Sequence, residues 1–242
     1  MNDVNCRPHV LIIGASSGLG ALCAEHFSSD YNVTGISRRG TIPNSVSMKT
    51  SLAISCDATS ADALKASVNE AVSKFGKISL MIVSVGSQLI KPVRNIKEQE
   101  VLNLLAANVA TPIYAASLFA SQRISTENAV LCLISSISSI RPEPGIVLYG
   151  ATKAATESLV AGLAKELAPR RVVGISPGWL DTPMTKSYSH IYTPEFIEEL
   201  KTSSPLGIAT TEDVVKAIEF LSSASAKKIT GQVLVVDGGA SL

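Results

Sequence analysis

Short apolar runs alternate along the chain with segments whose apolar residues recur at helical spacing. Helical periodicity predicts helices at Leu19–Phe27, Ala61–Phe75, Glu98–Ala120 and Tyr149–Ala168. Strand-length runs predict strands at Val10–Ile13, Val33–Ile36, Leu52–Ser55, Leu80–Val85, Ala129–Ile134, Val172–Ser176 and Val233–Val236. This alternation predicts an α/β fold with a doubly wound, Rossmann-type, mostly parallel seven-stranded sheet and helices on both faces.

No proline- or serine-rich linker and no internal repeat divides the 242 residues, so a single domain over residues 1–242 is expected. The longest departure from the strand–helix rhythm runs from Pro183 to Pro205. It contains one short helical piece, Thr193–Leu200, with Pro194 in its first turn. Long excursions of this kind often cover active sites, which makes residues 183–206 a candidate substrate-binding lid.

Composition narrows the choice of partners. The 21 basic and 20 acidic residues leave a formal charge of +1, which argues against a nucleic-acid-binding surface. The polar segment Met1–His9 lacks the apolar core of a signal peptide, and no apolar run is expected to span a membrane. A cytoplasmic protein with no membrane association is therefore expected.

The cysteines Cys6, Cys23, Cys56 and Cys132 are scattered, with no CxxC pair and no neighbouring histidine. This spacing favours neither a disulfide framework nor a metal site. We expect no metal, and interpret the four thiols as buried, small apolar groups in a reducing compartment.

A glycine-rich turn, Gly14-Ala-Ser-Ser-Gly18-Leu-Gly20, follows the first predicted strand and opens the first helix. Glycines at this spacing permit a tight turn, close approach of a pyrophosphate and packing of helix on strand, while the helix N-terminus attracts anions. Ser16 and Ser17 add hydroxyl donors, and Leu19 lies in the same turn. The turn predicts dinucleotide binding, the alternative being an ordinary glycine-rich turn.

The end of the second strand indicates which dinucleotide binds. Ser37-Arg38-Arg39 stands where an acidic residue would contact the adenosine ribose of NAD. Arginine offers a planar fork to a 2′-phosphate, so NADP(H) is favoured and NAD(H) is less favoured. Two solvated arginines are the alternative. After the third strand, Asp57-Ala58 would contact the adenine, unless Asp57 is a plain turn residue.

Tyr149 and Lys153 lie four residues apart at the start of a predicted helix, on one helix face. An unperturbed tyrosine titrates near pKa ~10, too high for efficient acid–base chemistry at neutral pH. A fixed positive charge favours the phenolate, so the pair predicts a general acid or base. Ser135 and Ser136 follow a strand at its carboxyl end, where such folds bind ligands.

These residues occur in an ordered set over Val10 to Gly239 that resembles the short-chain dehydrogenase/reductase family. The resemblance is closest to the β-ketoacyl carrier-protein reductases and small-ketone reductases. Its positions are Gly14, Gly18, Gly20, Asn108, Ser136, Tyr149, Lys153, Pro177-Gly178 and Val236-Asp-Gly-Gly239.

The resemblance implies a role for each matching residue. Tyr149 would be the general acid or base, Lys153 would hold the nicotinamide ribose and lower the Tyr149 pKa, and Ser136 would bind the substrate carbonyl. Asn108 would hold a water that relays protons to Lys153, unless it only marks a helix kink. The remaining cofactor contacts would come from Gly86, Pro177, Gly178, Leu180 and Thr182. A homodimer or homotetramer is also implied.

Three departures from the family pattern stand out. Ile13 replaces the usual threonine before the first glycine, and Val83-Ser84-Val85-Gly86 replaces Asn-Asn-Ala-Gly. The chain is also short between Pro169 and Pro177, where Arg170-Arg171 occupy an expected loop. These arginines would either meet an acidic carrier protein or be solvated.

The sequence thus predicts an NADP(H)-dependent oxidoreductase that interconverts a ketone or aldehyde with an alcohol, the small-molecule substrate being free or bound to a carrier protein. Two alternatives are an NAD(P)-dependent alcohol dehydrogenase working oxidatively and a non-catalytic dinucleotide sensor. Around the segment Met184–Leu206, with Trp179 at its root, we expect a partly apolar pocket. Tyr188, Tyr192 and Phe196 would either wall this pocket or serve as packing residues.

Overall fold

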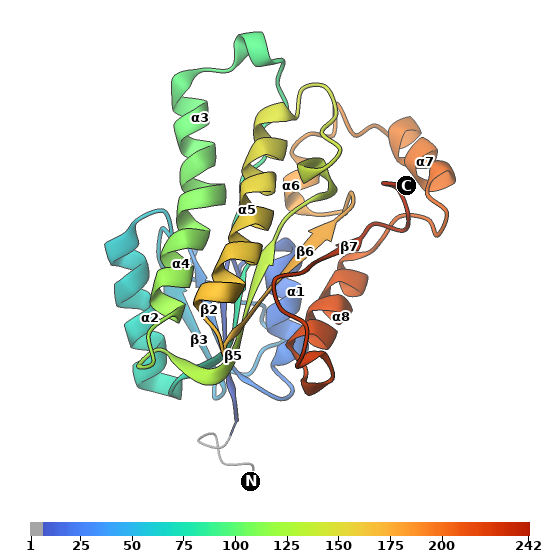
Figure 1. Cartoon of the computed structure of the whole chain (residues 1–242). Helices are drawn as coiled ribbons and strands as arrows, with labels where there is room; N and C mark the ends of the chain where they lie inside the picture. The colour runs from blue at the N-terminus through green and yellow to red at the C-terminus, as the bar shows by residue number, and fades with distance from the viewer. Residues whose placement is uncertain (1–6) are drawn as a thin grey trace.

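The computed structural model describes residues 7–242 and contains one parallel sheet in the strand order β3-β2-β1-β4-β5-β6-β7 (Figure 1). Every neighbouring pair of strands is parallel, which confirms the predicted fold class. The strand order reverses between the neighbouring strands β1 and β4, and folds of this kind bind ligands at the carboxyl ends of the strands beside such a reversal. The strands are β1 (His9–Ile13), β2 (Asn32–Ser37), β3 (Ser51–Ser55), β4 (Ile78–Val83), β5 (Ser125–Ile134), β6 (Arg171–Pro177) and β7 (Val233–Val236).

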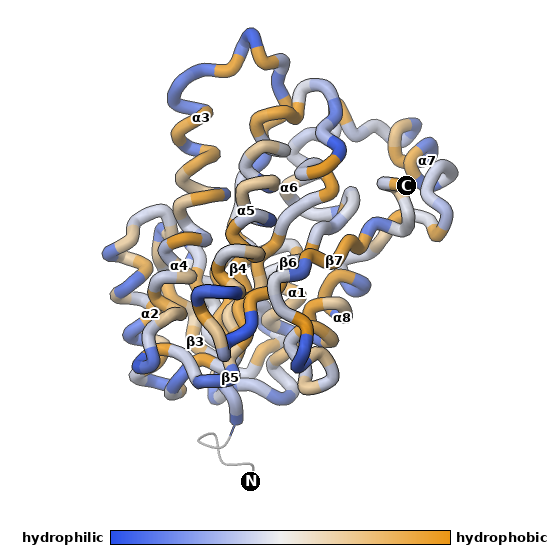
Figure 2. The backbone as a smooth tube through the Cα atoms, viewed as in Figure 1, coloured by the Kyte–Doolittle hydropathy of each residue, from blue (hydrophilic) through white to orange (hydrophobic). Residues whose placement is uncertain are grey.

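Helices cover both faces of this sheet. Alternate residues of β1 point to opposite faces, so Leu11 and Ile13 join one apolar core while Val10 and Ile12 join the other. The apolar strands form a hydrophobic interior beneath helices with hydrophilic outer positions (Figure 2). The first core is covered by α2 (Ala61–Phe75), α4 (Thr111–Phe119) and α5 (Val147–Glu166), and the second by α1 (Gly18–Phe27) and α8 (Thr211–Ser222).

Helix α8 was absent from the sequence expectations, although its signals are present. Val214, Ile218 and Leu221 repeat at helical spacing and are buried. Thr210 caps the helix, and Asp213 accepts a hydrogen bond from the Thr210 backbone in return.

The expected continuous helix over Glu98–Ala120 is wrong in its middle. Helix α3 (Glu98–Leu105) passes into a π-helical segment, Ala106–Ala110, before α4 begins. Pro112 has no backbone N–H to give to the carbonyl of Asn108, and its ring crowds that carbonyl. The backbone N–H of Thr111 instead reaches back five residues to Ala106, which is the π pattern.

The helical run Glu98–Phe119 is long and apolar enough to cross a membrane, with 22 residues and a mean hydropathy of 1.4, contrary to the expectation that no segment approaches this. Such a helix is weak evidence for a membrane span, because core helices share its composition. In the fold, Ala115, Ala116 and Phe119 of this run are buried in the core beside α2 and α5.

The segment 183–206 is only partly irregular. It contains the short helices α6 (Pro183–Lys186) and α7 (Pro194–Ser203), and α7 includes the predicted helical piece Thr193–Leu200 except for Thr193. Thr193 caps α7, and Pro194 occupies its first turn. Both helices lie at the end of the molecule where the strands finish (Figure 1).

Three of the cysteines, Cys23, Cys56 and Cys132, are buried and free, as expected. Cys6 lies outside the described residues. Burial raises the pKa of the Cys132 thiol to about 12, so this group is protonated at neutral pH.

Arg170 and Arg171 are not available to an acidic partner, which corrects the sequence interpretation of an arginine-bearing loop. Arg170 is buried, and its Nε donates to Ser125 Oγ at 2.6 Å. Arg171 begins β6, and its guanidinium donates to backbone carbonyls of Leu221, Ser222, Ser223 and Ile229. The shortened loop therefore joins β5, β6 and the end of α8.

We expect Arg171→Ala to destabilise the fold by about 2–4 kcal/mol, because several carbonyls at the end of α8 lose a charged donor. Urea denaturation followed by circular dichroism measures this change. The exposed Arg123→Ala is the control and is expected to change stability by less than about 0.5 kcal/mol. Equal effects of the two substitutions would contradict this role of Arg171.

Candidate active site

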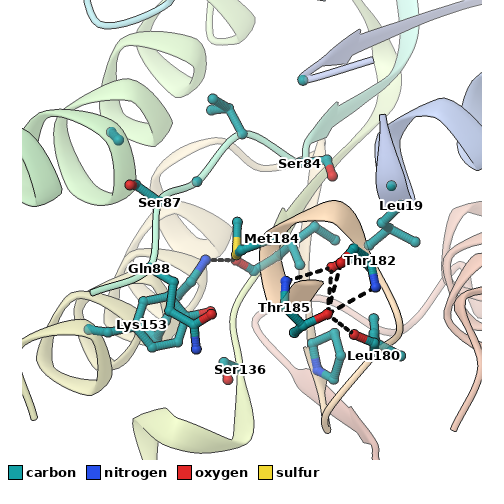
Figure 3. A pocket seen from close by; sticks show the side chains of 18 of the residues that line it. Leu19, Ser84, Ser87, Gln88, Ser136, Lys153, Leu180, Thr182, Met184 and Thr185 are labelled. Carbon is teal, nitrogen blue, oxygen red and sulfur yellow. Dashed lines mark hydrogen bonds between the residues drawn. The ribbon is translucent and has the colours of Figure 1, made fainter. Parts of the chain in front are cut away.

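A cleft of about 1460 Å³ lies at the carboxyl ends of the central strands. Every predicted catalytic or cofactor residue lines this cleft except Gly20 and Asn108. The aromatic residues Trp179, Tyr188, Tyr192 and Phe196 line it too, as the pocket interpretation expected. Figure 3 shows Ser136 and Lys153 on one side of the pocket and Leu180, Thr182 and Thr185 on another.

Two glycines of the glycine-rich turn, Gly14 and Gly20, leave no room for a side chain. Gly14 has φ +99°, and a Cβ there would lie 2.8 Å from the Val85 backbone nitrogen. A Cβ on Gly20 would lie 2.2 Å from the Gly14 carbonyl oxygen. Ser17 is the N-cap of α1 without using its side chain as a cap. The free amides and the bare backbone fit a pyrophosphate at this helix N-terminus.

The two arginines after β2 have different surroundings. Arg39 donates through Nε and Nη2 to the Ser16 hydroxyl, at 3.2 and 2.9 Å, and so braces the glycine-rich turn. Arg38 lies close enough to Asp57 to help lower the pKa of that carboxyl, whose main causes are hydrogen bonds from Thr59. Ser37 Oγ accepts a hydrogen bond from Gly40 N at 3.1 Å.

Tyr149 lies in the first turn of α5 and is 8% exposed. Burial raises the pKa of its phenol to about 12, while a hydrogen bond with Ser136 opposes this rise and nearby Tyr192 adds to it. At neutral pH the phenol is therefore a proton donor. The Ser136 hydroxyl and the Tyr149 phenol face the same part of the cleft.

Lys153 lies one helical turn after Tyr149, with its Nζ 5.6 Å from the centre of the Tyr149 ring. Its Nζ donates to the Ile134 carbonyl at 2.9 Å, at the end of β5. Burial lowers the Lys153 pKa to about 8. The causes that shift the Tyr149 pKa are burial, Ser136 and Tyr192, so the expectation that Lys153 lowers this pKa stays a prediction.

Asn108 lies inside the π segment and is 1% exposed. Its amide donates to the Ser87 carbonyl and to Thr152 Oγ1, and its oxygen accepts from Ser87 N at 2.8 Å. A Cβ on Gly86 would lie 3.4 Å from Asn108 Oδ1 and 3.6 Å from Lys153 Nζ. Asn108 therefore does lie at a helix irregularity, close to the Gly86 backbone that also approaches Lys153 Nζ, and its expected role in holding a water stays a prediction.

Ser136 is held by a short network that the sequence reading missed. Its hydroxyl caps a 3-10 turn, Ile137–Ser139, by accepting from Ser138 N at 3.2 Å. The carboxylate of Glu157 accepts from Ser139 Oγ at 2.5 Å and from Ser135 Oγ at 3.0 Å. Glu157 follows Lys153 by one helical turn, and that spacing was the only sequence signal for it.

The opposite wall of the site comes from the chain after β6. A Cβ on Gly178 would lie 2.9 Å from Asp237 Cβ, so the chain passes closely beside the segment after β7. Thr185 Oγ1 donates to the Leu180 carbonyl at 2.7 Å, and Thr182 N donates to Thr185 Oγ1 at 3.0 Å (Figure 3). Thr185, which was not predicted, therefore shapes the turn that carries Leu180 and Thr182.

Comparisons with known proteins agree with this geometry. The family model described as enoyl-(acyl carrier protein) reductase matches residues 14–241. A 3-oxoacyl-[acyl-carrier-protein] reductase FabG of Chlamydia muridarum is 29% identical over 251 residues and covers 99% of both chains.

Two solved structures from Brucella melitensis share the fold. A short-chain dehydrogenase/reductase described as a glucose/ribitol dehydrogenase gives a TM-score of 0.89 at 28% identity, covering 96% of both chains. A 3-ketoacyl-(acyl-carrier-protein) reductase complexed with NADH gives 0.82 at 26% identity, covering 99% of this chain and 100% of that one.

The chain belongs to the short-chain dehydrogenase/reductase family. It is accordingly an oxidoreductase that acts on CH–OH and C=O groups with NAD(P). The fold class and the enzyme class that the sequence predicts are thereby confirmed.

Because Glu157 positions the loop that carries Ser136, we expect Glu157→Gln to lower kcat by about 10- to 100-fold and to leave dinucleotide affinity within about twofold. Steady-state kinetics and a dinucleotide titration measure the two effects. Glu166→Gln, an exposed substitution on the same helix, is the control. A parallel loss of kcat and dinucleotide affinity would point to a general structural role instead.

Proposed function

We propose that this protein is an NADP(H)-dependent oxidoreductase that interconverts a ketone or aldehyde with an alcohol. The main support for the proposal is that one cleft is lined by Ser136, Tyr149 and Lys153 together with the glycine-rich turn. A bound nicotinamide dinucleotide supplies or accepts the hydride. The protein contributes placement of the carbonyl and delivery of the proton.

In the proposed reduction, Ser136 donates a hydrogen bond to the substrate oxygen and stabilises its developing negative charge. Tyr149, protonated because burial raises its pKa, donates the proton to the same oxygen. Lys153 would hold the nicotinamide ribose, and its charge would stabilise the phenolate that remains. Asn108 fixes the backbone around Ser87 and orients the water that returns a proton through Lys153.

The remaining assignments are part of the same proposal. Residues 183–206 act as a substrate lid within one domain over residues 1–242, because α6 and α7 contribute much of the substrate half of the cleft. We propose a cytoplasmic enzyme that takes a free or carrier-bound ketone. The apolar residues Leu102, Leu105 and Ile113 are more than a third exposed on α3 and α4, which supports self-association as a homodimer or homotetramer.

Preference for NADP(H) is proposed from the charges around the second strand. Arg38 is a cleft residue, and no acidic residue follows β2 before Gly40. An ionised acid there would repel a 2′-phosphate, whereas a guanidinium attracts it.

We expect Arg38→Ala to weaken NADPH binding by about 10- to 100-fold through loss of charged hydrogen bonds, and to leave NADH binding nearly unchanged. Titration with each dinucleotide measures this difference. Arg39→Ala is the matched control. Since Arg39 braces Ser16, its removal is expected to weaken both dinucleotides alike. Equal losses for the two dinucleotides in Arg38→Ala would contradict the phosphate assignment.

The proposed chemistry predicts that Tyr149→Phe lowers kcat by about 10²- to 10⁴-fold while NADPH still binds. A screen of NADPH consumption with ketones, aldehydes and β-ketoacyl thioesters measures turnover. NADP⁺ reduction with the corresponding alcohols measures the oxidative alternative. Tight binding of NADPH with no Tyr149-dependent turnover in either direction would leave the dinucleotide sensor as the function.

A further inference from the structure

Two polar side-chain atoms in the substrate half of the cleft are buried without a hydrogen-bond partner within residues 7–242. They are the amide oxygen Oε1 of Gln88 and the indole nitrogen Nε1 of Trp179. Both residues line the cleft that holds Ser136 and Tyr149. An unsatisfied buried polar group disfavours the folded state, so these two atoms need a physical explanation.

The backbone and side chain of Gln88 are fixed from the lid side. Tyr188 Oη donates to the Gln88 carbonyl at 2.9 Å, and Gln88 Nε2 donates to Tyr192 Oη at 2.8 Å. A tyrosine hydroxyl can donate or accept, so the amide can also bind it in the flipped orientation. Either orientation leaves one polar atom of the amide without a partner. Figure 3 shows this side chain among those that line the pocket.

Trp179 and Gln88 both contact Tyr192, the first through its ring and the second through its hydroxyl. The rings of Trp179 and Tyr192 meet edge to face with centroids 6.2 Å apart, and Tyr192 also accepts the hydrogen bond from Gln88. Tyr192 is near enough to Tyr149 to contribute to the rise of the Tyr149 pKa. The two unpartnered atoms therefore belong to one cluster beside the proton donor.

The chemistry of the cluster selects the group that it can bind. An indole nitrogen only donates, and a glutamine side chain offers an acceptor and donors. A hydroxyl group can accept a hydrogen bond from an indole N–H and donate one to an amide oxygen. None of the four side chains of the cluster, Gln88, Trp179, Tyr188 and Tyr192, is charged, so they offer hydrogen bonds and no ion pair to a bound group.

We propose that Gln88 and Trp179 form a subsite for a neutral hydroxyl group borne on the carbon next to the reacting carbonyl. The substrate class is then the α-hydroxyketones and, in the reverse direction, the vicinal diols. The proposal rests on the proposed carbonyl–alcohol chemistry and specifies the substrate of that same site. Gln88 and Trp179 are specificity residues in it, while Ser136 and Tyr149 keep their roles.

Kinetics with a matched pair of ketones test the subsite. We expect the wild-type enzyme with NADPH to prefer 3-hydroxy-2-butanone over 2-butanone by about tenfold or more in kcat/KM. Trp179→Phe and Gln88→Leu each remove one polar partner and are expected to lower the rate with the hydroxyketone while largely sparing 2-butanone. Tyr188→Phe, which removes a lid contact without removing either subsite atom, is the control and is expected to affect both ketones equally.

A binding measurement separates this proposal from the proposed function, since it needs no turnover. Trp179 is the only tryptophan of the chain, so its fluorescence reports directly on the subsite. We expect 2,3-butanediol to change this fluorescence at lower concentration than 2-butanol in the NADPH-bound enzyme, and Gln88→Leu to remove the difference. If the fluorescence difference is found but no ketone is reduced, the subsite is supported and the proposed function is contradicted.

The subsite is overturned if the diol and the monoalcohol bind equally, or if the two variants lose the same factor in kcat/KM with both ketones. Gln88 is then a structural link to the lid.

A second pair of substrates tests an amide in place of the hydroxyl. It comprises the 3-oxobutanoyl thioesters of N-acetylcysteamine and of ethanethiol, which differ by an amide. A preference for the first thioester that disappears in Trp179→Phe, with no hydroxyketone preference, would also overturn the proposal in favour of a carrier-arm contact.

Discussion

The geometry of the catalytic end depends on a hydrogen bond that Pro112 cannot make. Without an N–H at this position the helix opens into a π segment, and Asn108 turns its amide toward neighbouring elements. That amide joins the loop after β4 through Ser87 and the first turns of α5 through Thr152. Lys153 is the next residue on α5, so one backbone irregularity aligns the segments that carry the proton-transfer groups.

Burial then determines the protonation states of Tyr149 and Lys153 in this arrangement. Desolvation disfavours the charged form of both groups, so it raises the Tyr149 pKa to about 12 and lowers the Lys153 pKa to about 8. Near neutral pH the Tyr149 phenol therefore carries its proton, and Lys153 is charged in most of the molecules. This combination suits proton donation to a carbonyl, with the charge on Lys153 available to stabilise the phenolate as it forms.

The sequence predicted the sheet, its layers and the residues of the cleft, because these depend on local periodicity and on the carboxyl ends of strands. It did not predict the contacts made across the sequence. Arg171 appeared to lie in a solvated loop, yet it donates to carbonyls some 50 residues away at the end of α8. Glu157 and Thr185 position the site through hydrogen bonds whose partners only the fold brings together.

Gln88 shows how the lid and substrate selection can be coupled. Its backbone and side chain are bound by Tyr188 and Tyr192, which lie between α6 and α7. Under the proposed subsite, a substrate hydroxyl that binds the remaining atom of the amide also holds Gln88 against these tyrosines. A substrate without the hydroxyl leaves the buried amide and the Trp179 indole unsatisfied whenever the lid is closed. The enzyme would then select hydroxyl-bearing substrates through the free energy of lid closure. The groups that bind the reacting carbonyl would not need to distinguish between substrates.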